Sequence, residues 1–368
     1  MKVLLEKFSS YGICCGADVV PENLWKYLEG EIYLIGGLNL YYTGREIISL
    51  KRKTYNGKYK YKEMNNFEEA KNEIKEIKPN IIHSHTRGEK LTEINKEIKE
   101  SYNIPWIHTI HGFDEINGNY FEHFKNVDLL TTPSPYSAEK LEEKLETLNI
   151  EKLVIPVPNP IEIKNDSDIL RKSEKIRNNL GKEEFLILIP GRLQEDKGFF
   201  ETADAVIELL NEGYKDVKLI HIGFIFSDNE KKKLENKFKK TGYEDKLCIC
   251  GYVPSEDLSG YYKAVNVVCI PSDTTNETFS LAVGEALGLG TPVITSNIGA
   301  TKELWVDTGF AIGVEPKNKD DIFEKLKYVY ENYEKIKSSI ENKKYIIERD
   351  FHPVKISKIW EKIYQNFL

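Results

Sequence analysis

Short apolar runs alternate along this chain with longer stretches in which apolar residues recur every three or four positions. The run at residues 185–189 is almost continuously apolar, as expected of a strand buried on both faces. The stretch after it places Phe199, Ala203 and Val206 on one face, which is the spacing of an amphipathic helix. Because this alternation continues throughout the chain, it predicts an α/β fold with parallel sheets covered by helices on both faces.

The pattern predicts six strands in each half of the chain. Those of the first half are residues 2–5, 31–35, 80–83, 105–109, 127–132 and 152–155, with helices such as 67–77 and 136–148 between them. Those of the second half are residues 185–189, 217–222, 246–250, 265–270, 292–295 and 310–314. The C-terminus is predicted to form two helices, at residues 320–349 and 355–367.

A proline-dense stretch at residues 156–160 separates the two halves, and it can continue neither a helix nor a sheet. The 368 residues are also more than one compact core of ordinary size holds. We therefore predict two doubly wound domains, residues 1–160 and 161–350, that face each other across a cleft, and a helix at 351–368 that returns to the first domain. Ligands of such sheets bind at the carboxyl ends of strands, so residues just after strands are the candidates for chemistry.

Composition and charge narrow the function classes. A net charge of −7 argues against nucleic-acid binding, and no apolar run approaches the ~20 residues that span a bilayer. Residues 1–6 have the pattern of a first strand, and their apolar run is too short for the apolar region of a secretory signal peptide, so we expect a cytoplasmic protein. The five cysteines do not form a disulfide or zinc pattern. Cys248, Cys250 and Cys269 lie in apolar runs and are predicted to be core residues.

The loop after strand 185–189 carries two cations and two glycines, in Gly191-Arg192 and Lys197-Gly198. A helix follows this loop, so a cation, backbone N–H groups and a helix dipole all favour a phosphate there. The same loop holds Glu195 and Asp196, and a solvated surface loop is the alternative reading of this segment.

A second polar segment places Glu277 and Glu285 eight residues apart around the start of a predicted helix. Eight residues span about 12 Å along a helix, so the two carboxylates cannot share one proton or one metal ion. They could instead hold two hydroxylated parts of one extended ligand, with the helix N-terminus presented to a diphosphate. Taken singly, each glutamate could also be an ordinary surface carboxylate.

Together these two segments resemble the retaining glycosyltransferases of the GT-B fold that carry a Glu-x7-Glu signature, the glycosyl transferases group 1. The two motifs occur in the family's order, about eighty-five residues apart, and the resemblance covers essentially the second half. It implies a GT-B fold and transfer of a sugar from a nucleotide-diphosphate sugar to a hydroxyl acceptor, with retained configuration. UDP-sugars are favoured over GDP-sugars as the donor, and no cofactor or metal is expected.

The resemblance also implies roles for individual residues. Glu277 would contact sugar hydroxyls, Glu285 the nucleoside ribose, and Arg192 with Lys197 the two phosphates. His111 would lie near the transferred sugar, which completes the expected catalytic set. The remaining substrate contacts are expected at Gly16, Gly191, Gly223, Tyr252, Val253, Phe279, Ser280 and Leu281.

The sequence departs from the family pattern at three places, one of which is residues 222–225, where the second glycine of the usual strand-end pattern is absent. Gly12 and Gly16 are separated by three residues where the family has paired glycines, and Ser280 stands where glycine is common. In the first half, residues 79–85 and 107–113 resemble the family's strand ends more loosely.

Two sets of residues have the composition of a metal site. His83 and His85 are interpreted as strand-end histidines without a ligand, since nothing in their spacing demands a metal site with His108 and His111. Residues 166–168 form an Asp-x-Asp, the metal signature of the other major glycosyltransferase fold. That tripeptide is better explained as the N-cap of the helix that follows.

Several functions stay open on the sequence alone. The alternatives are a nucleotide-sugar epimerase or a phosphorylase on the same fold, or a non-catalytic partner subunit. An oxidoreductase is disfavoured because no Gly-x-Gly-x-x-Gly follows the first strand of either half. The acceptor is expected to be a glycan, lipid-linked or other hydroxyl compound, with a role in surface polysaccharide or glycoconjugate synthesis.

Residues 45–62 carry seven cations against one acid, around an Asn56-Gly57 hairpin turn. This basic segment either protects a sheet edge or forms a peripheral contact with a lipid-linked acceptor or the inner membrane face.

Overall fold

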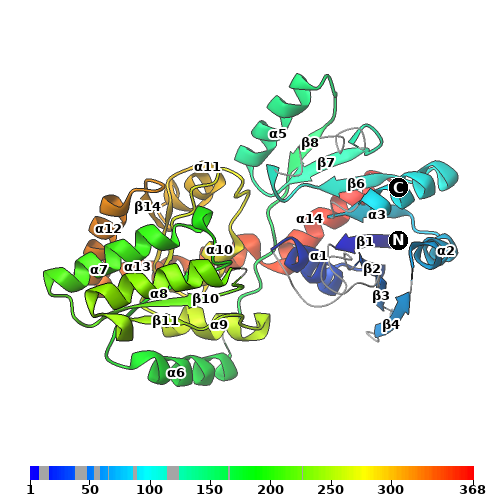
Figure 1. The fold of residues 1–368 in the computed structure, drawn as a ribbon. Helices are drawn as coiled ribbons and strands as arrows, with labels where there is room; N and C mark the ends of the chain where they lie inside the picture. The colour runs from blue at the N-terminus through cyan, green and yellow to red at the C-terminus, as the bar shows by residue number, and fades with distance from the viewer. Residues whose placement is uncertain are drawn as a thin grey trace. The chain divides into compact units, whose positions relative to one another are not determined.

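The chain divides into two compact units, each built around one sheet. The structure is a computed structural model, and it describes residues 1–7, 16–37, 48–53, 59–64, 66–85, 89–113, 124–164, 166–225 and 227–368. The first unit is Met1–Pro160 together with Phe351–Leu368, and the second is Ile161–Asp350. Each unit is a predominantly parallel sheet covered by helices, which confirms the predicted fold class (Figure 1).

The first sheet has eight strands in the order β4-β3-β2-β1-β5-β6-β7-β8. Their bounds are β1 Lys2–Lys7, β2 Glu31–Gly37, β3 Ile48–Lys53, β4 Tyr59–Met64, β5 Ile81–Ser84, β6 Trp106–Thr109, β7 Leu129–Thr132 and β8 Val154–Pro156. All pairings are parallel except those of β3, which runs antiparallel to β2 and β4. The described helices are α1 Gly16–Tyr27, α2 Phe67–Ile77, α3 Glu89–Tyr102, α5 Pro135–Thr147 and α14 Pro353–Gln365. Side chains of α2, α3 and α5 join one apolar core on this sheet.

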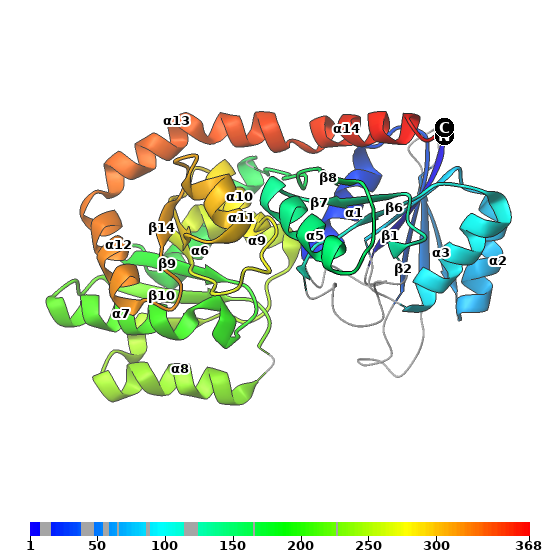
Figure 2. The same ribbon diagram turned by 90° about the horizontal axis from the view of Figure 1, so that it is seen from above.

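The second sheet has six parallel strands in the order β11-β10-β9-β12-β13-β14, the order of a Rossmann fold. Their bounds are β9 Phe185–Pro190, β10 Val217–Ile222, β11 Leu247–Ile249, β12 Val267–Ile270, β13 Val293–Ser296 and β14 Ile312–Val314. Its main helices are α6 Ser167–Gly181, α7 Phe199–Glu212, α8 Asp228–Thr241, α9 Ser255–Ala264, α10 Leu281–Gly288, α11 Gly299–Thr301, α12 Lys319–Glu331 and α13 Tyr333–Phe351. Short helical turns lie at Glu195–Lys197, Glu244–Lys246 and Lys302–Val306. Helices α7 and α8 of this unit are labelled in the view from above (Figure 2).

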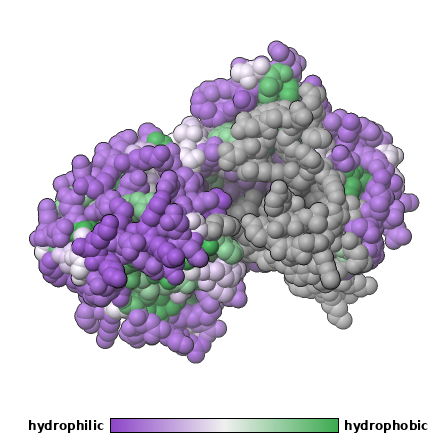
Figure 3. Space-filling view, in the orientation of Figure 1, coloured by the Kyte–Doolittle hydropathy of each residue, from purple (hydrophilic) through white to green (hydrophobic). Residues whose placement is uncertain are grey.

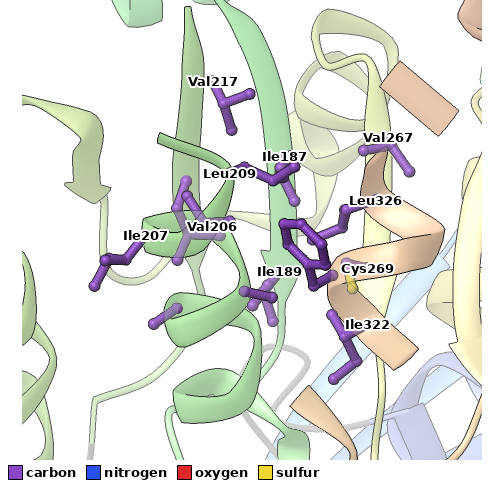
Figure 4. Packing of buried hydrophobic residues seen from close by; sticks show 14 of the residues in the cluster. Ile187, Ile189, Val206, Ile207, Leu209, Val217, Val267, Cys269, Ile322 and Leu326 are labelled. Carbon is purple, nitrogen blue, oxygen red and sulfur yellow. The ribbon is translucent and has the colours of Figure 1, made fainter. Parts of the chain in front are cut away.

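The core of the second unit forms where α7 and α12 pack on one face of the sheet. Ile187 and Ile189 of β9 point toward Val206 of α7 and Leu326 of α12 (Figure 4). These side chains are fully buried or nearly so, and each contributes on the order of 1.5–3 kcal/mol relative to an exposed position. The outer face of this unit is mostly hydrophilic, as the amphipathic pattern of its helices requires (Figure 3).

The predicted strands agree with the observed ones to within a few residues, and the predicted helix at 67–77 coincides with α2. The number of strands predicted for the first half was wrong, because β3 and β4 were not among them. Asp166 caps α6 by accepting hydrogen bonds from the backbone N–H groups of Asp168 and Ile169, as the N-cap interpretation expected. The single helix predicted at residues 320–349 was wrong. The chain forms two helices there, α12 and α13, because α12 ends at Asn332, whose side chain bonds to the Tyr328 carbonyl oxygen at 2.9 Å.

Candidate active site

The two segments singled out from the sequence come together at one edge of the second sheet. The strand order of this sheet reverses between β9 and β12, which are hydrogen-bonded neighbours. Gly191-Arg192 follows β9 directly, and the loop that leads to Glu277 follows β12. Loops at such a reversal diverge and leave room for a ligand at the carboxyl ends of the strands.

Backbone contacts hold the two loops against each other. The Asp273 N–H and the Ser272 hydroxyl both donate to the carbonyl oxygen of Asp196, at 3.0 and 3.1 Å. Gly198 lies between the loops with φ +70°, and a Cβ there would lie 2.5 Å from the carbonyl oxygen of Pro271. A glycine is therefore required where the β9 loop enters α7.

Lys197 and Glu277 form an ion pair between these loops, from Lys197 Nζ to Glu277 Oε1. Their side chains are 16% and 24% exposed, so the pair is screened by solvent less than a surface ion pair. The expected phosphate-binding cation thus lies beside the expected sugar-binding carboxylate. Arg192, at the end of β9, is exposed.

The backbone conformation at the start of α10 explains why glycine is common in the family at the position of Ser280. Ser280, its N-cap, has φ +60° and ψ +78°, in the left-handed region that favours glycine. Its side chain makes no capping hydrogen bond, and its carbonyl oxygen accepts from the Val283 N–H at 3.2 Å. The preceding residue, Phe279, is buried, and its carbonyl oxygen accepts a hydrogen bond from Trp305 Nε1 at 2.8 Å.

Glu285 lies within α10, and the hydroxyl of Tyr262 on α9 donates a hydrogen bond to it. Burial raises the pKa of Glu285 to about 7, although the bond from Tyr262 and the charge of Lys164 act in the opposite direction. Sequence reasoning missed Tyr262, since its position on the apolar side of a helix pattern carries no sign of a polar partner. The carboxyl group therefore titrates near neutral pH.

The ends of the neighbouring strands are close-packed through glycines. A Cβ on Gly223, after β10, would lie 1.9 Å from the Gly191 carbonyl oxygen, and the Gly223 N–H donates to the Gly251 carbonyl oxygen at 2.8 Å. Tyr252, in the loop after β11, is 54% exposed, and its ring lies 4.7 Å from that of Phe224. The adjacent Val253 is buried. An exposed aromatic pair thus borders the glycine-rich strand ends.

Four histidines lie at strand ends of the first unit, where its strand order reverses between β1 and β5. His85 Nδ1 and His111 Nε2 are 2.9 Å apart, and their rings are stacked. Burial lowers the pKa of His83 and of His85 well below the usual value, so both rings are neutral. His108 Nδ1 lies 2.7 Å from the Ser84 hydroxyl.

His83 joins the sheet to the C-terminal helix α14. Its two ring nitrogens lie 2.6 Å from the Tyr364 hydroxyl and 2.7 Å from the Thr109 hydroxyl. Its ring also packs against Trp360, with centroids 4.2 Å apart. His83 thus has a structural environment, and the described residues contain no group of three or more histidine, cysteine or acidic side chains that could hold a metal ion.

The expected site residues are distributed over both units. Gly16, which begins α1, and His111 belong to the first unit, and all the others belong to the second. Gly12, Arg45 and the Asn56-Gly57 turn lie outside the described residues. In the part of the chain that the structure covers, no helix is long and apolar enough to cross a membrane.

Comparison with known proteins identifies the domain to which this site belongs. Residues 171–345 match the family model of the glycosyl transferases group 1. A relative, an uncharacterized glycosyltransferase of Methanocaldococcus jannaschii, is 28% identical over 264 residues, which are 67% of this chain and 64% of that protein. The chain spans 56% to 64% of the length of the first curated relatives that it matches.

Solved structures show the fold. Anabaena HepE in complex with UDP and glucose aligns over 100% of both chains with a TM-score of 0.74 and 16% identity. Sucrose-phosphate synthase of Thermosynechococcus elongatus aligns over 99% of this chain and 98% of that one, with a TM-score of 0.80 and 16% identity. The chain therefore has the GT-B fold, and residues 171–345 match the family model of the glycosyl transferases group 1.

Proposed function

We propose that this protein is a retaining glycosyltransferase that uses a nucleotide-diphosphate sugar, with a UDP-sugar favoured and a GDP-sugar as the other candidate. The second unit would bind the donor, and the first unit with α14 would bind the acceptor. The observation that carries the proposal is the meeting of Lys197, Glu277 and the start of α10 at the β9–β12 reversal. A cation, a carboxylate and a helix N-terminus are the partners that a diphosphate and a sugar require.

In the proposed complex, Arg192 and Lys197 hold the two phosphates and Glu285 accepts from the ribose hydroxyls. The bond between the anomeric carbon and the diphosphate oxygen breaks, and the acceptor hydroxyl attacks from the same face and gives its proton to the departing diphosphate oxygen. The two cations and the α10 N-terminus stabilise the negative charge that grows on the leaving diphosphate. Glu277 exchanges its ion pair with Lys197 for contacts with sugar hydroxyls, so the free protein holds both groups ready for the donor.

The remaining expected contacts complete the proposed donor site. Gly191 and Gly223 would let the backbone approach the phosphates, and Tyr252 with Val253 would border the base. Phe279, Ser280 and Leu281 would present the amide groups of the helix start. His111 would contact the transferred sugar and Gly16 the acceptor. For the acceptor itself we propose a glycan or lipid-linked hydroxyl compound of surface polysaccharide or glycoconjugate synthesis.

The test is a calorimetric screen of the full chain against UDP, GDP and ADP, followed by the sugars of the base that binds. We expect UDP to bind best and Arg192→Ala to weaken it about tenfold or more, since a hydrogen bond to a charged group contributes about 1.5–3 kcal/mol. Arg171→Ala is the matched control because Arg171 is an exposed arginine of the same unit, paired with Asp168 on α6. A folded protein that binds none of the three nucleotides would contradict the proposal.

A further inference from the structure

Two thiols lie side by side at the edge strand of the second sheet. Cys248 Sγ and Cys250 Sγ are 3.6 Å apart, and both side chains are half-buried. The prediction that they are core residues was therefore wrong, whereas Cys269 is buried as predicted. Cys248 lies on β11, the last strand of its sheet, and Cys250 directly follows this strand. The Cys250 N–H still donates to the His221 carbonyl oxygen of β10, so the two side chains keep the strand spacing and share one face.

The surroundings of this thiol pair favour a thiolate at Cys248. The hydrogen bond from the Cys250 thiol, assisted by the charge of Lys218, lowers the pKa of Cys248 to about 6. The pKa of Cys250 is raised, chiefly by that same hydrogen bond and by burial, although the hydroxyl of Tyr261 also donates to its sulfur. One sulfur is thus the nucleophile and the other keeps its proton until it is needed.

A chain of backbone hydrogen bonds runs from the thiol pair to the loop that we propose binds phosphate. The Cys250 N–H donates to the His221 carbonyl oxygen at 2.9 Å, and the Gly251 carbonyl oxygen accepts from Gly223. The Gly191 N–H in turn bonds to the Ile222 carbonyl oxygen at 2.8 Å. Because Gly223 packs directly on Gly191, a displacement of Gly223 is passed on to the loop after β9.

We propose that Cys248 and Cys250 are a modification site that forms a reversible disulfide with a low-molecular-weight disulfide as oxidant, and that this disulfide weakens donor nucleotide binding by the second unit. The second part of the proposal rests on the proposed function, and the first part does not.

The reaction balances as a thiol–disulfide exchange. The Cys248 thiolate attacks one sulfur of the oxidant R–S–S–R, forms a mixed disulfide and expels the thiolate RS⁻. Cys250 then loses its proton and attacks the Cys248 sulfur, which releases the second RS⁻. Two electrons pass from the two protein thiols to the oxidant, which leaves as two molecules of RSH after protonation.

Closing the bond must deform the end of β11. A disulfide brings the two sulfurs to about 2.05 Å, and the Cα atoms of strand residues two apart lie about 6.6 Å from each other, at the upper end of the range that a disulfide tolerates. The strand therefore has to shorten at Cys250, which pulls Gly251 away from Gly223. The hydrogen bond from Tyr261 to the Cys250 sulfur is lost as well.

The test uses the full chain with Cys14 and Cys15 changed to serine, so that Cys248, Cys250 and Cys269 remain. The protein is incubated with glutathione disulfide, and intact mass with peptide mapping locates any bond. Burial raises the pKa of Cys269 to about 12, which makes it an internal unreactive control. We expect a 248–250 disulfide that dithiothreitol reverses, and in Cys250→Ser only a glutathione adduct. Absence of the internal disulfide while Cys248 takes up glutathione would overturn the proposal.

Two readouts follow the consequence of the bond. In calorimetry we expect oxidation to weaken UDP binding about threefold or more, and reduction to restore it. Cys250→Ser cannot form the internal disulfide and should not show the weakening that this bond causes. In hydrogen exchange without nucleotide we expect faster exchange at Gly191, Leu193 and Gly223 after oxidation. The hydrogen-exchange readout still tests the coupling if no nucleotide binds. The absence of nucleotide binding would contradict the proposed function instead. Formation of the disulfide with unchanged exchange would overturn the coupling.

Discussion

Because its burial raises the pKa, the carboxyl group of Glu285 changes its protonation state near neutral pH. Its pKa is about 7 in the folded protein and 4.5 as a free side chain. The folded state therefore holds a proton that the unfolded state releases between pH 4.5 and 7, and the free energy of unfolding falls as the pH rises through that window. The full loss, above pH 7, is on the order of 3 kcal/mol.

We predict that Glu285→Gln removes this loss. Urea denaturation at pH 5 and pH 8 should show a larger fall in the free energy of unfolding for the wild type than for the variant, by up to about 3 kcal/mol. Glu6 in the first unit, whose pKa burial raises to about 8, contributes equally to both proteins and cancels in the comparison. Parallel pH profiles would mean that Glu285 does not titrate in this range.

The two glutamates should also separate in function. If Glu285 binds the ribose, Glu285→Gln weakens free UDP in calorimetry, whereas Glu277→Gln leaves free UDP binding nearly unchanged and lowers the rate of sugar transfer. The physical reason is that free UDP lacks the sugar that Glu277 would contact. A reversed pattern would mean that the two roles are exchanged.

At the scale of single residues, the sequence pattern placed Lys197 and Glu277 after buried strands, and the family resemblance placed them in one site. It could not predict that Tyr262 donates a hydrogen bond to Glu285, since the neighbours of a helix face depend on tertiary packing. The error at Cys248 and Cys250 has a similar cause. An apolar run looks the same in a central strand and in an edge strand, and the strand order that makes β11 an edge is not local information.

Among the elements, α10 begins with the strained conformation of Ser280. A left-handed backbone costs a residue with a Cβ about 1–2 kcal/mol, and a change to glycine removes this cost. Part of that gain in stability is lost again, because glycine has greater conformational freedom in the unfolded chain. We predict that Ser280→Gly stabilises the protein by about 0.5–1 kcal/mol in urea denaturation. Ser280→Ala, which keeps the Cβ, should be nearly neutral and Ser280→Val destabilising. A loss of stability in the glycine variant would contradict this account.

The basic segment at residues 45–62 gives rise to β3 and β4, and β4 lies at the edge of the first sheet. Lys62 on β4 forms an ion pair with Glu73 of α2. Both facts favour edge protection, because charged side chains on an edge strand keep other strands from pairing with it.

We therefore predict that changing Lys58, Lys60 and Lys62 to glutamate leaves co-sedimentation with anionic vesicles at low salt unchanged. A contact with the membrane surface would instead lose about 1 kcal/mol for each lysine removed, and the variant would stay in the supernatant.

Periodicity located most elements because each strand is short, apolar and bounded by polar loops. It failed at the boundary between α12 and α13, where apolar residues keep a helical spacing across Asn332 and the helix ends through a side-chain contact. The order of the strands in the first sheet could not be predicted from the sequence pattern either. The insertion of β3 antiparallel between β2 and β4 depends on pairing between segments, not on the pattern within either one.

At the scale of the whole molecule, the last helix of the chain belongs to the first unit. Trp360 of α14 is buried against His83, and the Tyr364 hydroxyl bonds to the same ring. The Glu29 N–H also donates to the Glu361 carboxylate at 2.8 Å. The core of the first unit is thus completed by residues encoded after the whole of the second, so its final packing requires the entire chain.

This arrangement predicts a selective effect of Trp360→Ala. Removing a buried tryptophan costs about 3–5 kcal/mol, which for a unit of this size lowers the melting temperature by roughly 10 °C. In scanning calorimetry we expect the transition of the first unit to shift while that of the second keeps its midpoint, and the UDP affinity of the folded protein to stay unchanged. Tyr345→Ala is the control, because Tyr345 is 59% exposed on α13 of the second unit. If Trp360→Ala lowers both transitions equally or neither, α14 does not stabilise the first unit selectively, and the packing of Trp360 on His83 contributes little to its stability.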